Sequence, residues 1–321
     1  MEQRKIDEQF MRRCLQLAKC GRMGAAPNPM VGAVVVCDGR IIGEGYHRKC
    51  GEAHAEVNAI STVTQPHLLS RSTIYVSLEP CAHYGKTPPC AQLIIDKGIP
   101  TVVVGCRDPF AKVDGRGISM LREAGCEVRV GVLEKECLWL NRRFITFHTQ
   151  HRPYVTLKWA QSEDGYIDRL RLDDSQPPVR FSTSVTQALV HKLRAEHQAI
   201  LVGHRTWELD NPSLNVRHWA GNSPLRVVLG HTSVGNGDVL TYPTREEALA
   251  DLWTRGVQSL LVEGGRETLQ GFIDAGLWDE ARIETAPIRL GSGTKAPKIG
   301  GRIGKKLLIG DNTLTLIYKN S

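Results

Sequence analysis

The chain has 321 residues, 41% of them hydrophobic and 23% charged, and a formal net charge of +7 at pH 7. This length favours two domains, and the scattered basic residues, with only 6% aromatics, argue against a nucleic-acid binder, which gathers its positive charges into one patch. No apolar run approaches the ~18 residues of a membrane span, the polar start is not a signal peptide, and nine cysteines without an export signal favour a reducing cytoplasm over a disulfide framework. The surplus positive charge indicates either an ordinary solvated surface or a mild preference for small anionic substrates.

The composition changes near the middle of the chain. All nine cysteines lie between Cys14 and Cys137, whereas all six tryptophans lie between Trp139 and Trp278. Pro153 interrupts regular structure just before a new strand-like run. We therefore predict two domains, residues 1–148 and residues 149–321.

The first unit alternates predicted helices with predicted strands. Apolar residues at helical spacing predict an opening helix that ends near Gly21, and the apolar run 31–36 predicts a buried strand that pairs through a turn with 41–43. The elements expected after this hairpin are helices over 53–61, 91–97 and 118–124 and strands over 73–78, 101–105 and 127–132. This alternation predicts an α/β fold with a layered sheet.

One imidazole and two thiols in this unit form the pattern of an open metal site. His54 is followed by Glu56, and after a gap come Cys81 and Cys90, each preceded by proline. Three protein ligands with a vacant fourth position are typical of catalytic zinc, which lowers the pKa of a bound water to roughly 7. The order H-x-E followed by P-C and a second cysteine is typical of zinc-dependent base deaminases, in which the glutamate is a general acid/base. The alternative is ordinary packing of these side chains, or a structural zinc whose fourth ligand would be Cys50.

These residues fall at predicted junctions between strands and helices, where open α/β sheets bind their ligands. Cys90 is expected at a helix N-terminus, where the backbone dipole lowers the pKa of a thiol. Residues two apart on a helix point about 200° away from each other. His54 and Glu56 can therefore share a site only if the end of the helix lies against the metal.

The loop between the two thiols contains eight residues rather than the two of a C-x-x-C motif. Lys86 would offer a point charge to a phosphate, and His83 and Thr87 would donate hydrogen bonds to it. The alternative is a solvent-exposed loop whose polar residues bind nothing.

Four stretches, 27–32, 45–47, 54–56 and 79–90, resemble the deaminase half of the bifunctional deaminase/reductases of riboflavin biosynthesis. The resemblance implies a cytidine-deaminase-like domain with three α/β/α layers. The roles that it implies are zinc binding by His54, Cys81 and Cys90, proton transfer by Glu56, and substrate binding by Asn28, His47, His83 and Lys86, the last two near the ribose phosphate. The chain departs from the family at Phe110, where an asparagine is expected.

The second unit also has an α/β pattern. The expected strands are 154–160, 199–202, 225–229, 259–262, 282–288 and 306–318, and the expected helices are 182–197, 245–253 and 268–275. The pair Gly264-Gly265 follows a strand and opens a helix. Such a turn can admit a phosphate to the helix N-terminus, although a plain turn is an equal alternative.

Several motifs of this unit, including Asp164-Gly165, 199–203 and 210–214, resemble the reductase half of the same family. The resemblance implies a dihydrofolate-reductase-like α/β fold that uses NADPH. The implied contacts to NADPH are Ala160, Thr206, Asp210, Gly264 and Gly265, and the implied substrate contacts are Arg194, Leu214, Arg217 and Glu263, with Lys158 a further candidate. Arg194 and Arg217 suit a substrate phosphate, although either could form an ordinary salt bridge. Two prolines interrupt the match over 175–183, so we transfer no serine or tryptophan role there.

The whole pattern predicts a two-step enzyme. We expect hydrolytic deamination of a phosphoribosylamino-diaminopyrimidinone, followed by reduction of its ribosyl group to ribityl with NADPH. The alternatives are a deaminase with a degenerate second domain for substrate holding or dimerisation, and a nucleic-acid base deaminase. We further expect a homo-oligomer, either a dimer or a tetramer, that binds neither nucleic acid nor membrane.

Overall fold

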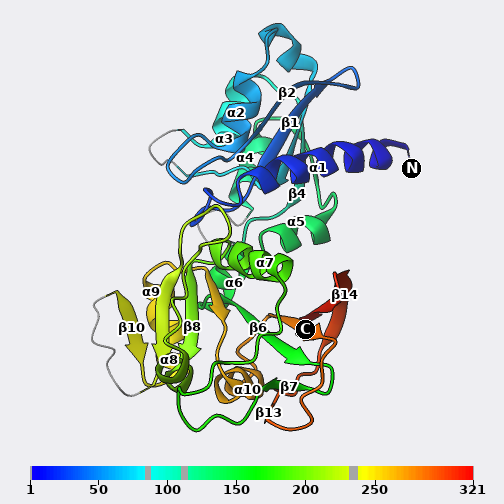
Figure 1. Cartoon of the computed structure of the whole chain (residues 1–321). Helices are drawn as coiled ribbons and strands as arrows, with labels where there is room; N and C mark the ends of the chain where they lie inside the picture. The colour runs from blue at the N-terminus through cyan, green and yellow to red at the C-terminus, as the bar shows by residue number, and fades with distance from the viewer. Residues whose placement is uncertain (1, 84–87, 110–114, 231–237, 321) are drawn as a thin grey trace. The chain divides into compact units, whose positions relative to one another are not determined.

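The computed structural model describes residues 2–83, 88–109, 115–230 and 238–320. It divides into two compact units, Met1–Gln150 and His151–Ser321 (Figure 1). The division falls two residues after the predicted domain boundary. Among the described residues, no helix combines the length and apolar character needed to cross a membrane.

A five-stranded sheet forms the centre of the first unit, in the order β2-β1-β3-β4-β5. The strands are β1 (Gly32–Cys37), β2 (Arg40–Tyr46), β3 (Thr73–Leu78), β4 (Thr101–Cys106) and β5 (Glu127–Val130). β1 runs antiparallel to β2 and β3, whereas β3, β4 and β5 are parallel. The carboxyl ends of β3 and β4 therefore lie at one edge of the sheet, which is where α/β folds place their ligands.

Two apolar clusters cover the two faces of this sheet, because successive side chains of a strand point to opposite faces. Ala33 and Val35 pack on the side of helices α2 (Ala55–Ser61), α3 (Cys90–Asp96) and α4 (Arg116–Glu123). Val34 and Val36 pack on the other side, with α1 (Glu2–Cys20) and α5 (Glu134–Leu140). The predicted three-layer α/β/α architecture is confirmed. The remaining elements of the unit are the 3-10 helix η1 (Pro66–Arg71) and α6 (Arg142–Gln150).

The second unit contains an eight-stranded sheet in the order β10-β9-β8-β11-β6-β12-β15-β14. All neighbours from β10 to β12 are parallel, and the β12-β15 and β15-β14 pairs are antiparallel. The strands are β6 (Tyr154–Ser162), β8 (Ala199–Gly203), β9 (Leu225–Leu229), β10 (Val239–Tyr242), β11 (Ser259–Val262), β12 (Glu280–Ala286), β14 (Arg302–Ile309) and β15 (Asn312–Tyr318). A separate pair joins β7 (Tyr166–Asp168) to β13 (Thr294–Lys295). The predicted α/β class holds for this unit as well.

Helices cover both faces of this larger sheet. α9 (Arg245–Thr254) and α10 (Arg266–Asp274) bury their apolar residues against one face, where Phe272 is fully enclosed. α7 (Ser184–Ala195) and α8 (His204–Asp210) contribute Leu193 and Trp207 to the cluster on the other face. α7 begins two residues later than predicted because Thr183 caps it, in a reciprocal capping box with Thr186.

Candidate active sites

The three predicted zinc ligands come together at the carboxyl edge of the first sheet. The Nδ1 atom of His54 lies 3.6 Å from Sγ of Cys81 and 3.4 Å from Sγ of Cys90. All three donor atoms lie within 4.8 Å of one another. One imidazole nitrogen and two thiol sulfurs are ligands that zinc prefers, and three of them leave a fourth position open. The arrangement therefore fits a catalytic zinc ion.

The start of α2 explains how His54 and Glu56 reach the same site. His54 is the N-cap residue with extended backbone angles (φ −70°, ψ 167°), whereas Glu56 lies in the first helical turn. The helical spacing rule does not apply across this change of conformation, so the two side chains can converge. Glu56 is 3% exposed and shares a side-chain hydrogen bond with Cys90.

Burial and neighbouring thiols control the charges in this site. Burial of the carboxyl group, reinforced by Cys81, raises the pKa of Glu56 to about 7, a value suited to proton transfer at neutral pH. Hydrogen bonds from Cys90 and His54 lower the pKa of Cys81 to about 4. The pKa of Cys90 is raised by its hydrogen bond to Cys81 and by burial.

The helix N-terminus that we predicted to act on the Cys90 thiol acts on the neighbouring Cys81 thiol. Cys90 does begin α3, but its own backbone N–H donates to Sγ of Cys81 at 3.3 Å. The helix N-terminus thus favours the thiolate of Cys81, because that sulfur faces the free N–H group.

Asn28 and His47, predicted to bind substrate, form a pair beside the ligands. Nδ2 of Asn28 lies 3.1 Å from Nε2 of His47, and Nδ1 of His47 lies 3.1 Å from the carbonyl oxygen of Ala53. A carbonyl only accepts, so Nδ1 carries the ring proton and Nε2 accepts from Asn28. Burial lowers the pKa of His47, which keeps the ring neutral. Its ring meets that of His54 edge to face, with centroids 5.4 Å apart.

Glu79 is a buried residue whose role the sequence did not reveal. Its two carboxylate oxygens accept four backbone N–H bonds, at 3.0–3.3 Å, from Asp108, Gly115, Gly117 and Ile118. These contacts join the end of β3 to the start of α4, two residues before the ligand Cys81. In the sequence, Glu79 directly follows a predicted buried strand and stands two residues before Cys81. We interpreted Glu79-Pro80-Cys81 only as part of the zinc motif.

Two residues of the predicted phosphate loop cannot be placed, because Lys86 and Thr87 lie outside the described residues, as does Phe110. His83 is described and is exposed. Its predicted contact with the ribose phosphate stays a prediction.

In the second unit, the predicted NADPH residues lie at the carboxyl ends of neighbouring parallel strands. Ala160 is in β6, Thr206 follows β8 in α8, and Gly264 and Gly265 follow β11. The backbone N–H of Gly265 donates to Oγ1 of Thr206 at 3.0 Å. A Cβ atom added to Gly264 would lie 2.9 Å from Cβ of Thr268, so this turn has no room for a side chain. The glycine pair therefore lets the turn pack closely against Thr206 and Thr268.

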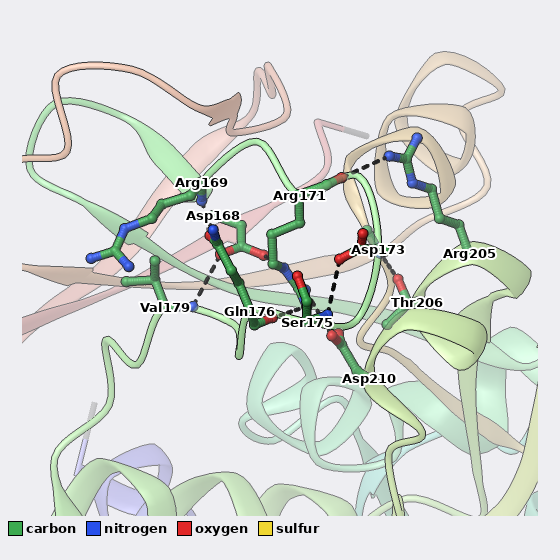
Figure 2. A network of polar contacts seen from close by, with 11 residues as sticks. Asp168, Arg169, Arg171, Asp173, Ser175, Gln176, Val179, Arg205, Thr206 and Asp210 are labelled. Carbon is green, nitrogen blue, oxygen red and sulfur yellow. Dashed lines mark hydrogen bonds and ion pairs between the residues drawn. The ribbon is translucent and has the colours of Figure 1, made fainter.

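Asp210 lies one helical turn after Thr206 and is held by an arginine. Nη2 of Arg171 donates to Oδ1 of Asp210 at 2.7 Å, and Nε of Arg171 donates to Oδ2 of Asp168 at the same distance. Figure 2 shows this arginine between the two carboxylates. Arg171 could not be predicted from the sequence, because it lies in a stretch without apolar periodicity.

Two predicted substrate residues bind each other. Nη2 and Nε of Arg194, near the end of α7, donate to the two carboxylate oxygens of Glu263 at 2.7 and 3.1 Å. Burial opposes the charge of Glu263, but the charge and hydrogen bonds of Arg194 outweigh it and hold the pKa of Glu263 below its usual value. The charge of Lys158 acts on Glu263 in the same direction, so the structure brings these three residues close together. Lys158 also lines a cavity of about 40 Å³ between α7 and the sheet.

Leu214 and Arg217 lie in the loop after α8. Leu214 is 2% exposed and has a left-handed backbone (φ 50°), so it anchors the loop in the core. Arg217 is exposed, and its Nη1 atom donates to the side chains of Ser213 and Asn215. No described carboxylate forms an ion pair with Arg217, which leaves its charge available to an anion.

The divergent stretch 175–183 is held by hydrogen bonds to strands β7 and β12. Val179 donates its backbone N–H to Oδ1 of Asp168 at 3.0 Å, and Ser182 donates its hydroxyl to the buried Glu284 at 2.7 Å. The two prolines therefore lie in an ordered loop that leads into α7.

Comparison with known proteins agrees with this architecture. Residues 4–106 match the model of the cytidine and deoxycytidylate deaminase zinc-binding region, and residues 153–313 match that of the RibD C-terminal domain. The riboflavin biosynthesis protein RibD of Aquifex aeolicus is 37% identical, with 93% of this chain and 92% of the relative covered, and that of Escherichia coli is 33% identical, with 89% of each covered.

A solved structure from Thermotoga maritima shows the same fold over the whole chain. It is a diaminohydroxyphosphoribosylaminopyrimidine deaminase/5-amino-6-(5-phosphoribosylamino)uracil reductase, 34% identical, with a TM-score of 0.88 and coverage of 99% of this chain and 100% of that chain. The chain thus has both halves of a bifunctional enzyme, and it belongs to the family of the riboflavin biosynthesis protein RibD.

Proposed function

We propose that this chain catalyses two successive reactions on one phosphorylated pyrimidine. The first unit hydrolyses the amino group of 2,5-diamino-6-(5-phosphoribosylamino)pyrimidin-4(3H)-one, and the second unit reduces the ribosyl group of the product to ribityl with NADPH. The observation that carries the proposal is the convergence of His54, Cys81 and Cys90 beside the buried Glu56, in a chain whose second unit matches the reductase domain of the same family.

In the first reaction, His54, Cys81 and Cys90 would hold a zinc ion, which would supply an activated water. Glu56 would accept one proton from that water and pass it to the ring, and would then carry a second proton from the hydroxyl group added to the ring to the leaving amine. Its pKa of about 7 suits both directions of this transfer, because it can be protonated or ionised near neutral pH. Asn28 and the neutral His47 would hold the substrate through hydrogen bonds.

In the second reaction, we assign NADPH to Ala160, Thr206, Asp210 and the turn Gly264-Gly265. The half-buried turn supports this assignment, because it lies at the start of α10, where a helix N-terminus can receive a cofactor phosphate. We assign the substrate to Leu214, Arg217, and the Arg194–Glu263 pair, with Lys158 beside it. Arg217 is the better phosphate ligand of the two arginines, because Glu263 already balances the charge of Arg194.

Replacing Glu56 by Gln tests the first step. We expect release of ammonia to be lost. The amount of zinc bound per chain should equal that of the wild-type protein, because Glu56 is not a zinc ligand. Hydride transfer should continue when the deaminated intermediate is supplied. Glu52→Gln is the matched control, since Glu52 lies in the same stretch but is exposed. Retained deamination in the Glu56→Gln variant would contradict the assigned role.

A deaminase with a degenerate second unit is the alternative function. The match of residues 153–313 to the RibD C-terminal domain and the contact between Thr206 and Gly265 favour a working reductase. Oxidation of NADPH by the purified chain, followed in the presence of the deaminated intermediate, distinguishes the two, because only the reductase consumes the cofactor.

We also propose a homo-oligomer, either a dimer or a tetramer, in the cytoplasm. β14 is an edge strand of the larger sheet, and it exposes Ile303 (59%) and Leu308 (76%). An edge strand with exposed apolar residues is suited to pairing with a second copy of the chain. Light scattering coupled to size-exclusion chromatography should give a mass of at least two chains, and a monomer would contradict this proposal.

A further inference from the structure

Arg171 joins three separate segments of the second unit. Its guanidinium binds Asp168 at the end of β7 and Asp210 at the end of α8, each at 2.7 Å, and it donates to the carbonyl oxygen of Gln176 at 3.2 Å. The side chain is only 7% exposed. A buried arginine with three acceptors is fixed in place, because each donor that lost its partner would cost about 1–3 kcal/mol.

The segment around Arg171 is folded onto α8. Its own carbonyl oxygen accepts a hydrogen bond from Nη2 of Arg205 at 3.2 Å, and Asp168 accepts the backbone N–H of Val179 at 3.0 Å. Figure 2 shows the resulting loop, with the side chain of Arg171 directed inward and that of Arg169 directed away from it. The two leucines of this loop, Leu170 and Leu172, contribute little to holding it, since they are 76% and 97% exposed. Polar contacts centred on Arg171 therefore determine where it lies.

These contacts end beside the proposed cofactor residues. Asp210 follows Thr206 by four residues, so both side chains lie on one face of α8. Thr206 accepts the N–H of Gly265, at the turn proposed to bind NADPH. The position of the Asp210 carboxylate, on the same face of α8 as Thr206, thus depends on Arg171.

We propose that Arg171 is a positioning residue for NADPH binding. It holds the Asp210 carboxylate and keeps the loop 169–180 against α8, without itself touching the reacting atoms. The inference rests on the proposed reductase function of this unit. An ordered site costs less conformational entropy on binding than one that must be ordered by the ligand. Arg171 should therefore affect the affinity for NADPH more than the rate of hydride transfer.

The test compares Arg171→Ala, Arg171→Lys and the control Arg169→Ala in the full-length protein. The reductase assay uses the deaminated intermediate and varies NADPH, and NADPH binding is also titrated by its fluorescence. We expect Arg171→Ala to raise KM for NADPH about tenfold, because binding must then order the loop and Asp210, with kcat within about twofold. Arg171→Lys should give a smaller increase, since an ammonium group cannot reproduce the forked contacts. Arg169→Ala should match the wild type, because its side chain is exposed and points away.

The two activities of one chain separate a local effect from misfolding. Deamination serves as the internal reference, and it should be unchanged in all three variants. If Arg171→Ala unfolds the second unit, Asp168→Asn tests the proposal instead. This substitution removes one of the negative charges that bind Arg171, but it keeps a side-chain oxygen that can accept the backbone N–H of Val179. It should raise KM for NADPH about threefold through the same loss of order.

A KM for NADPH equal to that of the wild type in folded Arg171→Ala or Asp168→Asn would overturn the role of Arg171. An equal rise in the Arg169→Ala control would also overturn it. Failure of the proposed function has a different result, namely wild-type protein that neither binds nor oxidises NADPH.

Discussion

Glu56 and Glu79 are both buried glutamates near the zinc ligands, but their surroundings give them different tasks. Among the described residues, no backbone N–H group of a neighbouring segment is shown donating to the carboxylate of Glu56. Burial raises the pKa of Glu56 to about 7, so this carboxyl group can exchange a proton. Glu79 accepts four backbone N–H bonds, so its oxygens are occupied by the protein. The environment of each carboxylate, rather than the residue type, assigns one to catalysis and the other to holding Cys81.

We expect Glu79→Gln to weaken zinc binding about tenfold, the lower range for groups that support metal ligands. The amide group of glutamine would place N–H donors against backbone N–H groups, which frees the loop that carries Cys81. Competition with a chromogenic chelator measures the affinity, and NADPH oxidation should be unchanged.

Glu123→Gln is the control for this substitution, since it alters an exposed carboxylate on the same helix α4. Zinc affinity equal to that of the wild type, together with loss of deamination, in the Glu79→Gln variant would contradict this role. Glu79 would then support deamination in some way other than by positioning Cys81.

The zinc ligands could be predicted from the sequence because their chemistry depends on residue type and order alone. The partners of Glu79 could not, since they lie 29–39 positions away in the chain and depend on the folded backbone. The same reason applies to the contact between Arg171 and Asp210, which are 39 positions apart. The donors to Glu79 are backbone N–H groups, which every residue except proline possesses, so no side chain in the sequence indicates these contacts.

At the scale of elements, the Arg194–Glu263 pair fastens the end of α7 to the turn after β11. The side chains are 13% and 10% exposed, so each would leave a buried, unpaired charge if its partner were removed. The pair also belongs to the proposed substrate site, and a rigid α7 is needed to keep Leu193 and Arg194 in place. Stability and substrate binding therefore depend on the same contact.

We expect Glu263→Gln to lower the free energy of unfolding of the second unit by about 3 kcal/mol at pH 7, because Arg194 loses its counter-charge. The pKa of Glu263 in the folded protein is lower than its ordinary value of 4.5. The contribution is thus complete above pH 4.5 and decreases as the pH falls from 4.5 through the lower pKa of the folded state. The difference between the two proteins should shrink over that window.

Urea unfolding at pH 7 and at pH 4 measures this difference. Tryptophan fluorescence reports mainly on the second unit, which has five of the six tryptophans. Glu267→Gln alters an exposed carboxylate in α10 and should cause no such change. A difference of the same size at both pH values would show that the charge of Glu263 is not what stabilises the contact.

Elements with a strong apolar pattern could be predicted from the sequence, and weakly patterned ones could not. The strands β3 and β9 have the predicted bounds, because their buried runs are bordered by turn residues. α8 was missed because none of its residues is buried, so no periodic apolar signal exists. The short strand β10 was missed for a similar reason, since only one of its four residues is buried.

At the scale of the molecule, each unit has its own sheet and its own apolar clusters on both faces of that sheet. Each unit should therefore unfold as a cooperative body with its own ligand, zinc for the first and NADPH for the second. The bifunctional activity would then rest on two separately stabilised folds.

Scanning calorimetry tests this independence. At a concentration of 100 times its dissociation constant, NADPH stabilises the unit that binds it by about 2.7 kcal/mol, which corresponds to a shift of roughly 5–10 °C for a domain of this size. We expect this shift only in the transition that tryptophan fluorescence assigns to the second unit, and removal of zinc by a chelator should lower only the other transition. The control is Arg171→Ala, in which the same NADPH concentration should produce a smaller shift while the effect of the chelator is unchanged. A single transition that both treatments move equally would contradict separate stability of the units, because ligand binding energy would then be shared across the whole chain.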